Sequence, residues 1–233
     1  MNYNIFNIFP TTVYAGRLEN HESHKAEFYN VYPKFDYEED GEDVNTVSEN
    51  SGNPLIHLEE TLNPLFEEIV IHVKKYMHEV LLLKDIFDVV ITKTWLSRAR
   101  QAKDQIQWHI HSTSHISFAY YLNMPKNSHS IKFQNQYQPN SLFLGMNDDD
   151  YPSNKRMFVE SYNEINSQTF FLVPEEGNVV LFPSKTIHCT DAMSDVFTGE
   201  RLAIVGDITL ILREEHLSYS MGYISEKYWK KFT

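Results

Sequence analysis

Apolar residues recur at two different spacings along the chain, which predict a helical first third followed by a longer region of strands. Between residues 63 and 83 they stand three and four positions apart and form one face: Leu65, Phe66, Ile69, Val73, Tyr76, Met77, Val80 and Leu81. This spacing is typical of an amphipathic helix. Asn63 can cap that helix, and Pro64 suits its first position, where a missing N–H costs nothing.

Short runs rich in β-branched and aromatic residues follow, and turn signals separate them. The expected strands are 87–95, 115–122, 130–133, 141–144, 168–173, 178–182 and 201–212, with a further one at 4–14. Clusters of proline, asparagine and glycine fall between them, as at 123–125 and 174–177. The pattern predicts a mainly β fold with flanking helices, namely a jelly-roll barrel with helices packed on one outer face.

Two polar stretches are expected to be loops. Residues 36–53 form an acidic surface loop, and residues 145–166 form a long loop of the kind that shapes substrate access at a barrel mouth. We interpret 1–233 as one domain with three parts. Residues 1–84 supply a strand and supporting helices, 85–212 the barrel core, and 213–233 a C-terminal extension.

Composition narrows the class of protein. A chain of 233 residues with 42% hydrophobic residues can bury one substantial core. The formal net charge of -12 repels phosphate backbones and disfavours a nucleic-acid partner. The sequence contains neither a membrane-spanning apolar run nor a signal-peptide pattern. Its single cysteine, Cys189, excludes an internal disulfide and fits a reducing compartment, so we expect a cytoplasmic protein.

Three histidines form a candidate metal site. The segment Trp108-His109-Ile110-His111 has the character of a strand, on which residues two apart share a face, so His109 and His111 can point at one metal. His188 follows the apolar strand that ends at Phe182. Neutral imidazole suits iron, zinc, copper and nickel alike, so these ligands do not choose the metal. The alternative is that one histidine is a hydrogen-bonding core residue.

Arg201 opens an apolar strand shortly after the third histidine. A buried guanidinium is costly unless an anion pairs with it. The carboxylate of a ligand is a natural partner because guanidinium binds carboxylate through two parallel hydrogen bonds. The alternative is a salt bridge within the protein.

Several motifs, in this order and spacing, carry a family resemblance over residues 95–212. They are Trp95, 108–111, 117–123 (Ser-Phe-Ala-Tyr-Tyr-Leu-Asn), 177–184 (Gly-Asn-Val-Val-Leu-Phe-Pro-Ser), His188 and 200–202 (Glu-Arg-Leu). Together they resemble the iron(II)- and 2-oxoglutarate-dependent dioxygenases, and among these the small oxygenases of bacteria and of phages that infect marine bacteria. In such phages the protein would act in the host cytoplasm.

The resemblance implies a double-stranded β-helix and a site inside it. Fe(II) falls to His109, His111 and His188, and the far carboxylate of 2-oxoglutarate to Arg201. Tyr121 is implied as a hydroxyl donor to that carboxylate, and Ser117 lies on the same strand face. With dioxygen as co-substrate, the implied activity is that of a hydroxylase.

Two departures from the family pattern affect this assignment. The usual second ligand is a carboxylate, whereas this chain has His111; if His111 is not a ligand, His115 or a water takes that place. The dianionic co-substrate would partly restore neutrality at a metal held by three imidazoles. Ala203 stands where relatives often carry a serine, so one hydrogen bond to the co-substrate is expected to be missing.

Other classes of function stay open at this point. One is a cupin-like barrel that binds metal and ligand without oxygenase turnover, and another is a phage structural protein. The substrate is expected to be a small molecule or a protein. The aromatic stretch 218–232 either packs on the barrel or forms a subunit contact, as in a homodimer.

Overall fold

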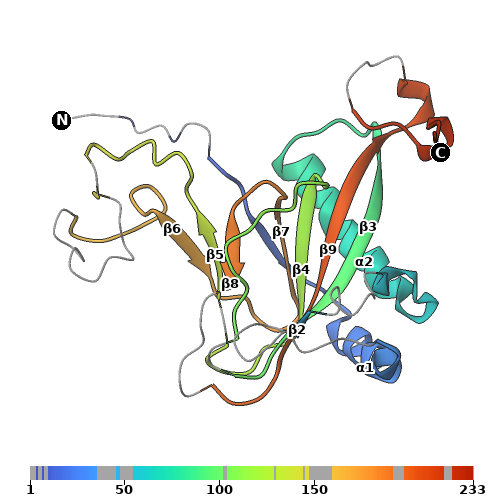
Figure 1. The fold of residues 1–233 in the computed structure, drawn as a ribbon, viewed down its shortest axis with the longest axis horizontal. Coiled ribbons are helices and arrows are strands. Elements are labelled where there is room, and N and C mark those ends of the chain that lie inside the picture. Colours follow the sequence, from blue (N-terminus) through green and yellow to red (C-terminus); the bar gives the residue numbers. More distant parts are fainter. Residues whose placement is uncertain are drawn as a thin grey trace.

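Two antiparallel sheets and two helices make up the computed structural model, which describes residues 4, 7, 10–35, 46–47, 55–101, 104–128, 130–143, 145–146, 159–190, 197–217 and 222–232. The large sheet has six strands in the order β1-β7-β4-β9-β3-β2, and the small sheet has three in the order β6-β5-β8. Figure 1 shows the small sheet standing apart from the large one, with α1 and α2 beyond the opposite face of the large sheet.

The large sheet consists of β1 (Tyr14–Arg17), β7 (Asn178–Pro183), β4 (Ile116–Asn123), β9 (Arg201–Leu212), β3 (Phe87–Ala99) and β2 (Thr46–Val47). The small sheet consists of β6 (Thr169–Leu172), β5 (Ile131–Gln134) and β8 (His188–Thr190). The helices are α1 (His21–Val31) and α2 (Asn63–Lys75), and α2 continues into a π-helical turn, η4 (Tyr76–Val80). Single 3-10 turns cover Tyr32–Lys34, Ile56–Leu58, Glu60–Leu62, Glu214–His216 and Glu226–Tyr228.

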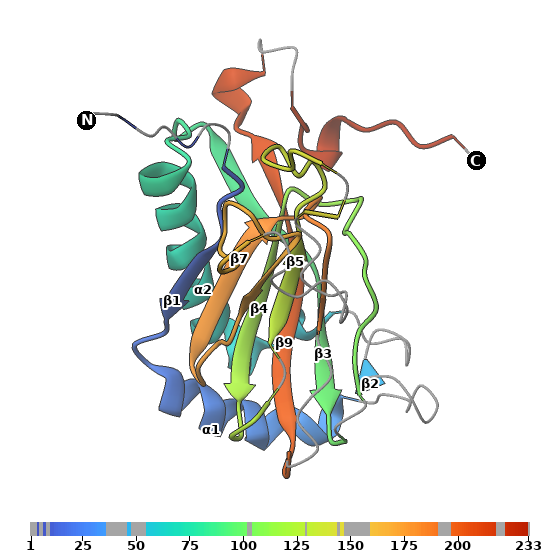
Figure 2. The ribbon, with the colours of Figure 1, turned by 90° about the vertical axis from the view of Figure 1, so that its left-hand side faces the viewer.

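Side-chain alternation gives the large sheet two buried faces. On β4, Phe118 and Tyr120 belong to the core cluster that also contains Phe28 of α1 and Ile69 of α2. Ala119 and Tyr121, which alternate with them along β4, face the small sheet and pack in a second cluster with Phe133 of β5. Figure 2 shows the large sheet face-on, with β5 in front of it and the helices behind it. The site described below lies on the face that looks toward the small sheet.

The predicted jelly-roll architecture is confirmed, and most strands lie where the pattern placed them. β9 spans Arg201–Leu212 as predicted, and β3 runs four residues beyond the predicted end, from Trp95 to Ala99. The helix begins at Asn63 itself, so Leu62 and not Asn63 occupies the cap position, and no side chain caps it. Its end is a π-helical turn that stops at Val80.

Three differences from the sequence prediction have local causes. No strand forms at 141–143, because turns satisfy the backbone there: the Ser141 amide donates to Gln138 and its hydroxyl to the Phe143 carbonyl. The first strand starts at Tyr14, at the end of the range expected for it. Helix α1 was not predicted, because two of its four buried positions are His21 and His24 and its apolar periodicity is weak.

Some expectations fall outside the described residues. Residue 144, most of the acidic stretch 36–53 and most of the long stretch 145–166 are in this group, although Thr46–Val47 of the first stretch forms β2. The division into three parts remains a prediction. Among the described helices, none combines the length and the apolar character needed to cross a bilayer.

Candidate metal centre

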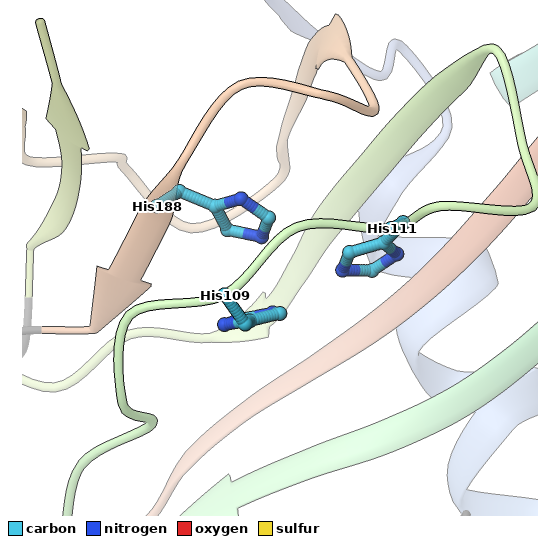
Figure 3. A group of neighbouring side chains, drawn as sticks. All are labelled: His109, His111 and His188. Carbon is cyan, nitrogen blue, oxygen red and sulfur yellow. The ribbon is translucent and has the colours of Figure 1, made fainter. Parts of the chain in front are cut away.

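The three predicted histidines converge. One ring nitrogen from each of His109, His111 and His188 lies within 4.8 Å of the others. Figure 3 shows the rings turned toward a common space, two of them from the segment before β4 and the third from the start of β8. Ring centroids are 4.2 Å apart for His109 and His188 and 5.1 Å apart for His111 and His188.

The way the chain achieves this differs from the prediction. His109 and His111 do not lie on a regular strand; His109 forms an isolated bridge with His188. The His109 amide donates to the His188 carbonyl, and the His188 amide donates to the His109 carbonyl, both at 3.0 Å. The His111 amide donates to the Ser184 carbonyl at 2.9 Å. Backbone pairing across the barrel therefore aligns the histidines, and strand alternation does not.

Each imidazole has an acceptor at Nδ1, which leaves Nε2 free. His109 Nδ1 lies 2.8 Å from the Gln107 carbonyl, and His188 Nδ1 lies 2.8 Å from the Thr186 carbonyl. His111 Nδ1 lies 2.6 Å from Asp207 Oδ1. A neutral imidazole that donates from Nδ1 has its lone pair on Nε2. The donor set thus fits a divalent transition metal held by three Nε2 atoms.

Burial favours the neutral form of two of these rings, those of His188 and His109. His188 is 6% exposed, and burial lowers its pKa to about 3, with a smaller contribution from His109. Burial also lowers the pKa of His109. Neutral imidazole is the form that binds a metal, so these two side chains would bind one at neutral pH without losing a proton.

His115, the alternative ligand, is committed elsewhere. Its Nδ1 accepts a hydrogen bond from the Leu210 amide at 3.0 Å, and its ring packs against Tyr223 with a centroid distance of 5.1 Å. The grouping around His188 does not include it. His111 therefore matches the third ligand position better than His115 does.

The guanidinium of Arg201 is buried. It is 2% exposed, and no carboxylate within the described ranges pairs with it. Its guanidinium carbon lies 5.3 Å from the centroid of the Tyr121 ring, and Nη1 lies 3.4 Å from Ser97 Oγ. Among the described atoms, neither Arg201 Nε nor the Tyr121 hydroxyl has a hydrogen-bond partner. Two adjacent orphaned donors of this kind can both serve one carboxylate of a ligand.

Ser117 is engaged in a different contact. Its hydroxyl lies 2.9 Å from Ser184 Oγ and 3.2 Å from Asp207 Oδ1, so its role toward a co-substrate stays a prediction. Ala203 pairs with Tyr121 on β4 and brings no hydroxyl to that position. Asp207 was missed by sequence reasoning, although an aspartate inside the largely apolar run 202–212 is a signal that could have found it.

Comparisons with known proteins agree with this chemistry. A family model described as "putative 2OG-Fe(II) oxygenase" matches residues 93–207. No curated protein sequence matches the chain at a significant level. The residues matched contain His109, His111, His188 and Arg201.

Solved structures share the fold. A prolyl-4-hydroxylase of Pseudomonas putida is 10% identical, with a TM-score of 0.52 over 85% of this chain and 92% of that chain. The 2-oxoglutarate-dependent epimerase SnoN of nogalamycin biosynthesis is 13% identical, with a TM-score of 0.55 over 90% and 83%. HygX of Streptomyces hygroscopicus, solved with nickel and 2-oxoglutarate, is 10% identical, with a TM-score of 0.53 over 92% of each chain. At these identities the likeness shows the double-stranded β-helix fold alone.

Proposed function

The chain belongs to the 2OG-Fe(II) oxygenase family, and from this premise we propose how its own residues divide the work. His109, His111 and His188 hold iron(II). Arg201 and Tyr121 bind the far carboxylate of 2-oxoglutarate. The activity is the hydroxylation of a substrate that is a small molecule or a protein, with dioxygen as co-substrate.

The observation that carries this assignment is the pairing of a histidine trio with a buried guanidinium that has no carboxylate partner among the described residues. Arg201 and Asp207 stand an even number of residues apart on β9, so their side chains share a face. Between them on that face are Ala203 and Val205, and Ala119 of β4 lies opposite Val205. We propose that a small diacid binds along this face, between the guanidinium and the histidines.

Charge supports the same pairing. Three neutral imidazoles leave the two positive charges of iron uncompensated, and Arg201 adds a third charge nearby. A dianionic ligand that touches both groups offsets most of this charge in a setting where water is scarce.

Each group then has a defined task. The bound iron and 2-oxoglutarate supply the oxidative chemistry of the family. The imidazoles hold the metal through Nε2, and the Nδ1 hydrogen bonds of His109 and His188 to backbone carbonyls fix the orientations of those two rings. Arg201 orients the co-substrate through its far end, and Tyr121 donates a second hydrogen bond there. Burial raises the pKa of the Tyr121 phenol, so it stays protonated and able to donate. Phe182, which packs against His188 at 4.6 Å between ring centroids, excludes water from the metal.

The test is anaerobic addition of iron(II) and 2-oxoglutarate to the purified chain. We expect a weak visible charge-transfer band, and we expect it to disappear in His188→Ala and in Arg201→Ala. His115→Ala is the matched control, because this nearby histidine is engaged outside the trio, and it should keep the band. A band that survives in both site variants would contradict the assignment.

Location and assembly belong to the same proposal. The single cysteine supports a reducing compartment such as the cytoplasm as the place of this activity. A homodimer formed through the aromatic C-terminal stretch is testable by light scattering, with removal of residues 218–233 expected to give a monomer.

A further inference from the structure

Asp207 of β9 contacts one member of the histidine trio and has no part in the assignment above. We propose that Asp207 is a positioning residue for the metal: it fixes His111 with Nε2 toward the ion and supplies the negative charge that three neutral imidazoles lack. This inference rests on the proposed metal site, and the experiment below separates the two.

The contact is short, buried and supported by other hydrogen bonds. Asp207 Oδ1 lies 2.6 Å from His111 Nδ1, and the two side chains are each 7% exposed. Ser114 Oγ and Ser117 Oγ donate to the same oxygen at 3.1 and 3.2 Å. Within the part of the chain that the structure describes, no lysine or arginine forms an ion pair with Asp207. A buried carboxylate in this setting directs its charge onto His111.

His111 differs in this respect from the other two histidines. His109 and His188 donate from Nδ1 to backbone carbonyls, which carry no net charge. Among the described residues, Asp207 is the one carboxylate hydrogen-bonded to the trio. A carboxylate behind an imidazole raises the basicity of the far nitrogen and fixes which nitrogen carries the proton. The effect of Asp207 on the metal is therefore exerted through a single ligand.

The surrounding structure holds both partners in place. Trp95 stacks on the His111 ring at 5.4 Å between centroids, with an interplanar angle of 28°. Asp207 pairs with Ser117 on one side and with Lys93 on the other, where β3 carries a bulge between Ile91 and Lys93. The Asp207 carbonyl also accepts a hydrogen bond from Thr92 Oγ1 at 3.2 Å. His111 is thus clamped by a ring on its face and a carboxylate at its edge.

The experiment measures cobalt(II) binding by the metal-free full chain, with cobalt alone as the probe and the visible cobalt absorption as the signal. We expect Asp207→Asn to weaken binding by about 10- to 100-fold, the range for loss of a group that orients a metal ligand. The cobalt absorption should shift as well, because a neutral amide donates less electron density through His111.

The matched control is Glu68→Gln. Glu68 Oε2 lies 2.7 Å from His24 Nε2, so this variant removes the charge of another buried histidine–carboxylate pair, which lies between α1 and α2. We expect Glu68→Gln to lower thermal stability and to leave cobalt affinity and absorption unchanged. If Asp207→Asn changes stability alone, as Glu68→Gln does, Asp207 is a structural residue and the inference is overturned.

A second measurement uses the wild-type chain, so it does not depend on whether a variant folds. Nitrogen NMR of the metal-free wild-type chain reports which ring nitrogen of His111 carries the proton. We expect the proton on Nδ1, and a proton on Nε2 would overturn the inference.

His111→Ala separates this inference from the proposed site. If His111→Ala abolishes cobalt binding and Asp207→Asn does not weaken it, the inference alone fails; if His111→Ala binds cobalt normally, the proposed site fails as well.

Discussion

Replacing Arg201 by methionine should separate a ligand-binding arginine from a structural one, because the two roles predict stability changes of different size. As half of a buried salt bridge, Arg201 would stabilise the fold, and its loss would leave a carboxylate buried without a partner, which costs about 3–5 kcal/mol. No such carboxylate is found for Arg201 among the described residues, and its Nε has no hydrogen-bond partner.

The contacts that methionine would remove are weak ones. Stacking of the guanidinium on Tyr121 contributes about 0.5–2 kcal/mol. The contact to Ser97 at 3.4 Å is long for a hydrogen bond and contributes roughly 0.5 kcal/mol or less. Relief of the buried, unpaired charge offsets these losses, since apolar replacement of buried ionic groups is often neutral or stabilising by about 1–4 kcal/mol. We therefore expect the free energy of unfolding of ligand-free Arg201→Met to lie within about 1 kcal/mol of the wild-type value, or above it.

Thermal unfolding with and without 2-oxoglutarate, in the presence of nickel(II), measures both roles. For a chain of this size about 1 kcal/mol corresponds to roughly 2–4 °C. At a 2-oxoglutarate concentration of about 100 times Kd, the free energy of unfolding of wild type should rise by about 2.7 kcal/mol, and its Tm by roughly 5–11 °C. Arg201→Met should show little or none of this gain.

Arg98→Met is the matched control. Arg98 is also buried, but it lies 3.9 Å from the carboxylate of Glu200 and on the opposite face of β3 from Ser97. This variant should keep the 2-oxoglutarate gain. A ligand-binding role for Arg201 is refuted if ligand-free Arg201→Met loses more than about 3 kcal/mol in free energy of unfolding and 2-oxoglutarate still stabilises it as it does wild type.

Three further predictions address the site and the strands behind it. Because the folded-state pKa of His188 is about 3 and the unfolded value is about 6.5, the unfolded metal-free chain binds more protons between these pH values, and stability falls as pH drops through that window. In denaturant titrations His188→Gln should lose less stability than wild type between pH 7 and 4, by on the order of 2–3 kcal/mol, and equal losses would count against a buried neutral His188. Tyr121→Phe should leave the stability of the ligand-free protein within about 1 kcal/mol and weaken 2-oxoglutarate binding about 10- to 100-fold by calorimetry, and unchanged binding would remove Tyr121 from the site. Gly206→Ala should lower the free energy of unfolding by roughly 1–3 kcal/mol, since the added carbon would lie 2.4 Å from the Phe118 ring; wild-type stability would show that this ring can move aside.

The local pattern of apolar residues predicted secondary structure correctly where a single spacing or residue class dominated a segment. The strand at Arg201–Leu212 was predicted to the residue, because its run of β-branched and apolar side chains has a turn signal before it. The segment 141–143 misled the same reasoning, since leucine and phenylalanine there are exposed and pair with no neighbouring strand. Strand propensity describes a side chain that fits a pleated surface, and it does not supply the neighbour that completes the sheet.

By itself, the sequence determined the candidate site residues: three histidines and an arginine in an order and spacing that predict a metal and an anion. Tertiary structure alone decided how they meet. Reciprocal backbone hydrogen bonds across the barrel align His109 and His188. Arg201 lies beside Tyr121, and among the described residues no carboxylate neutralises it. The carboxylate of Asp207 contacts the ring of His111. The physical reason is the separation in sequence over which each kind of information acts. Periodicity reports on neighbours three or four residues away, whereas these contacts depend on strand order and register between segments far apart in the chain.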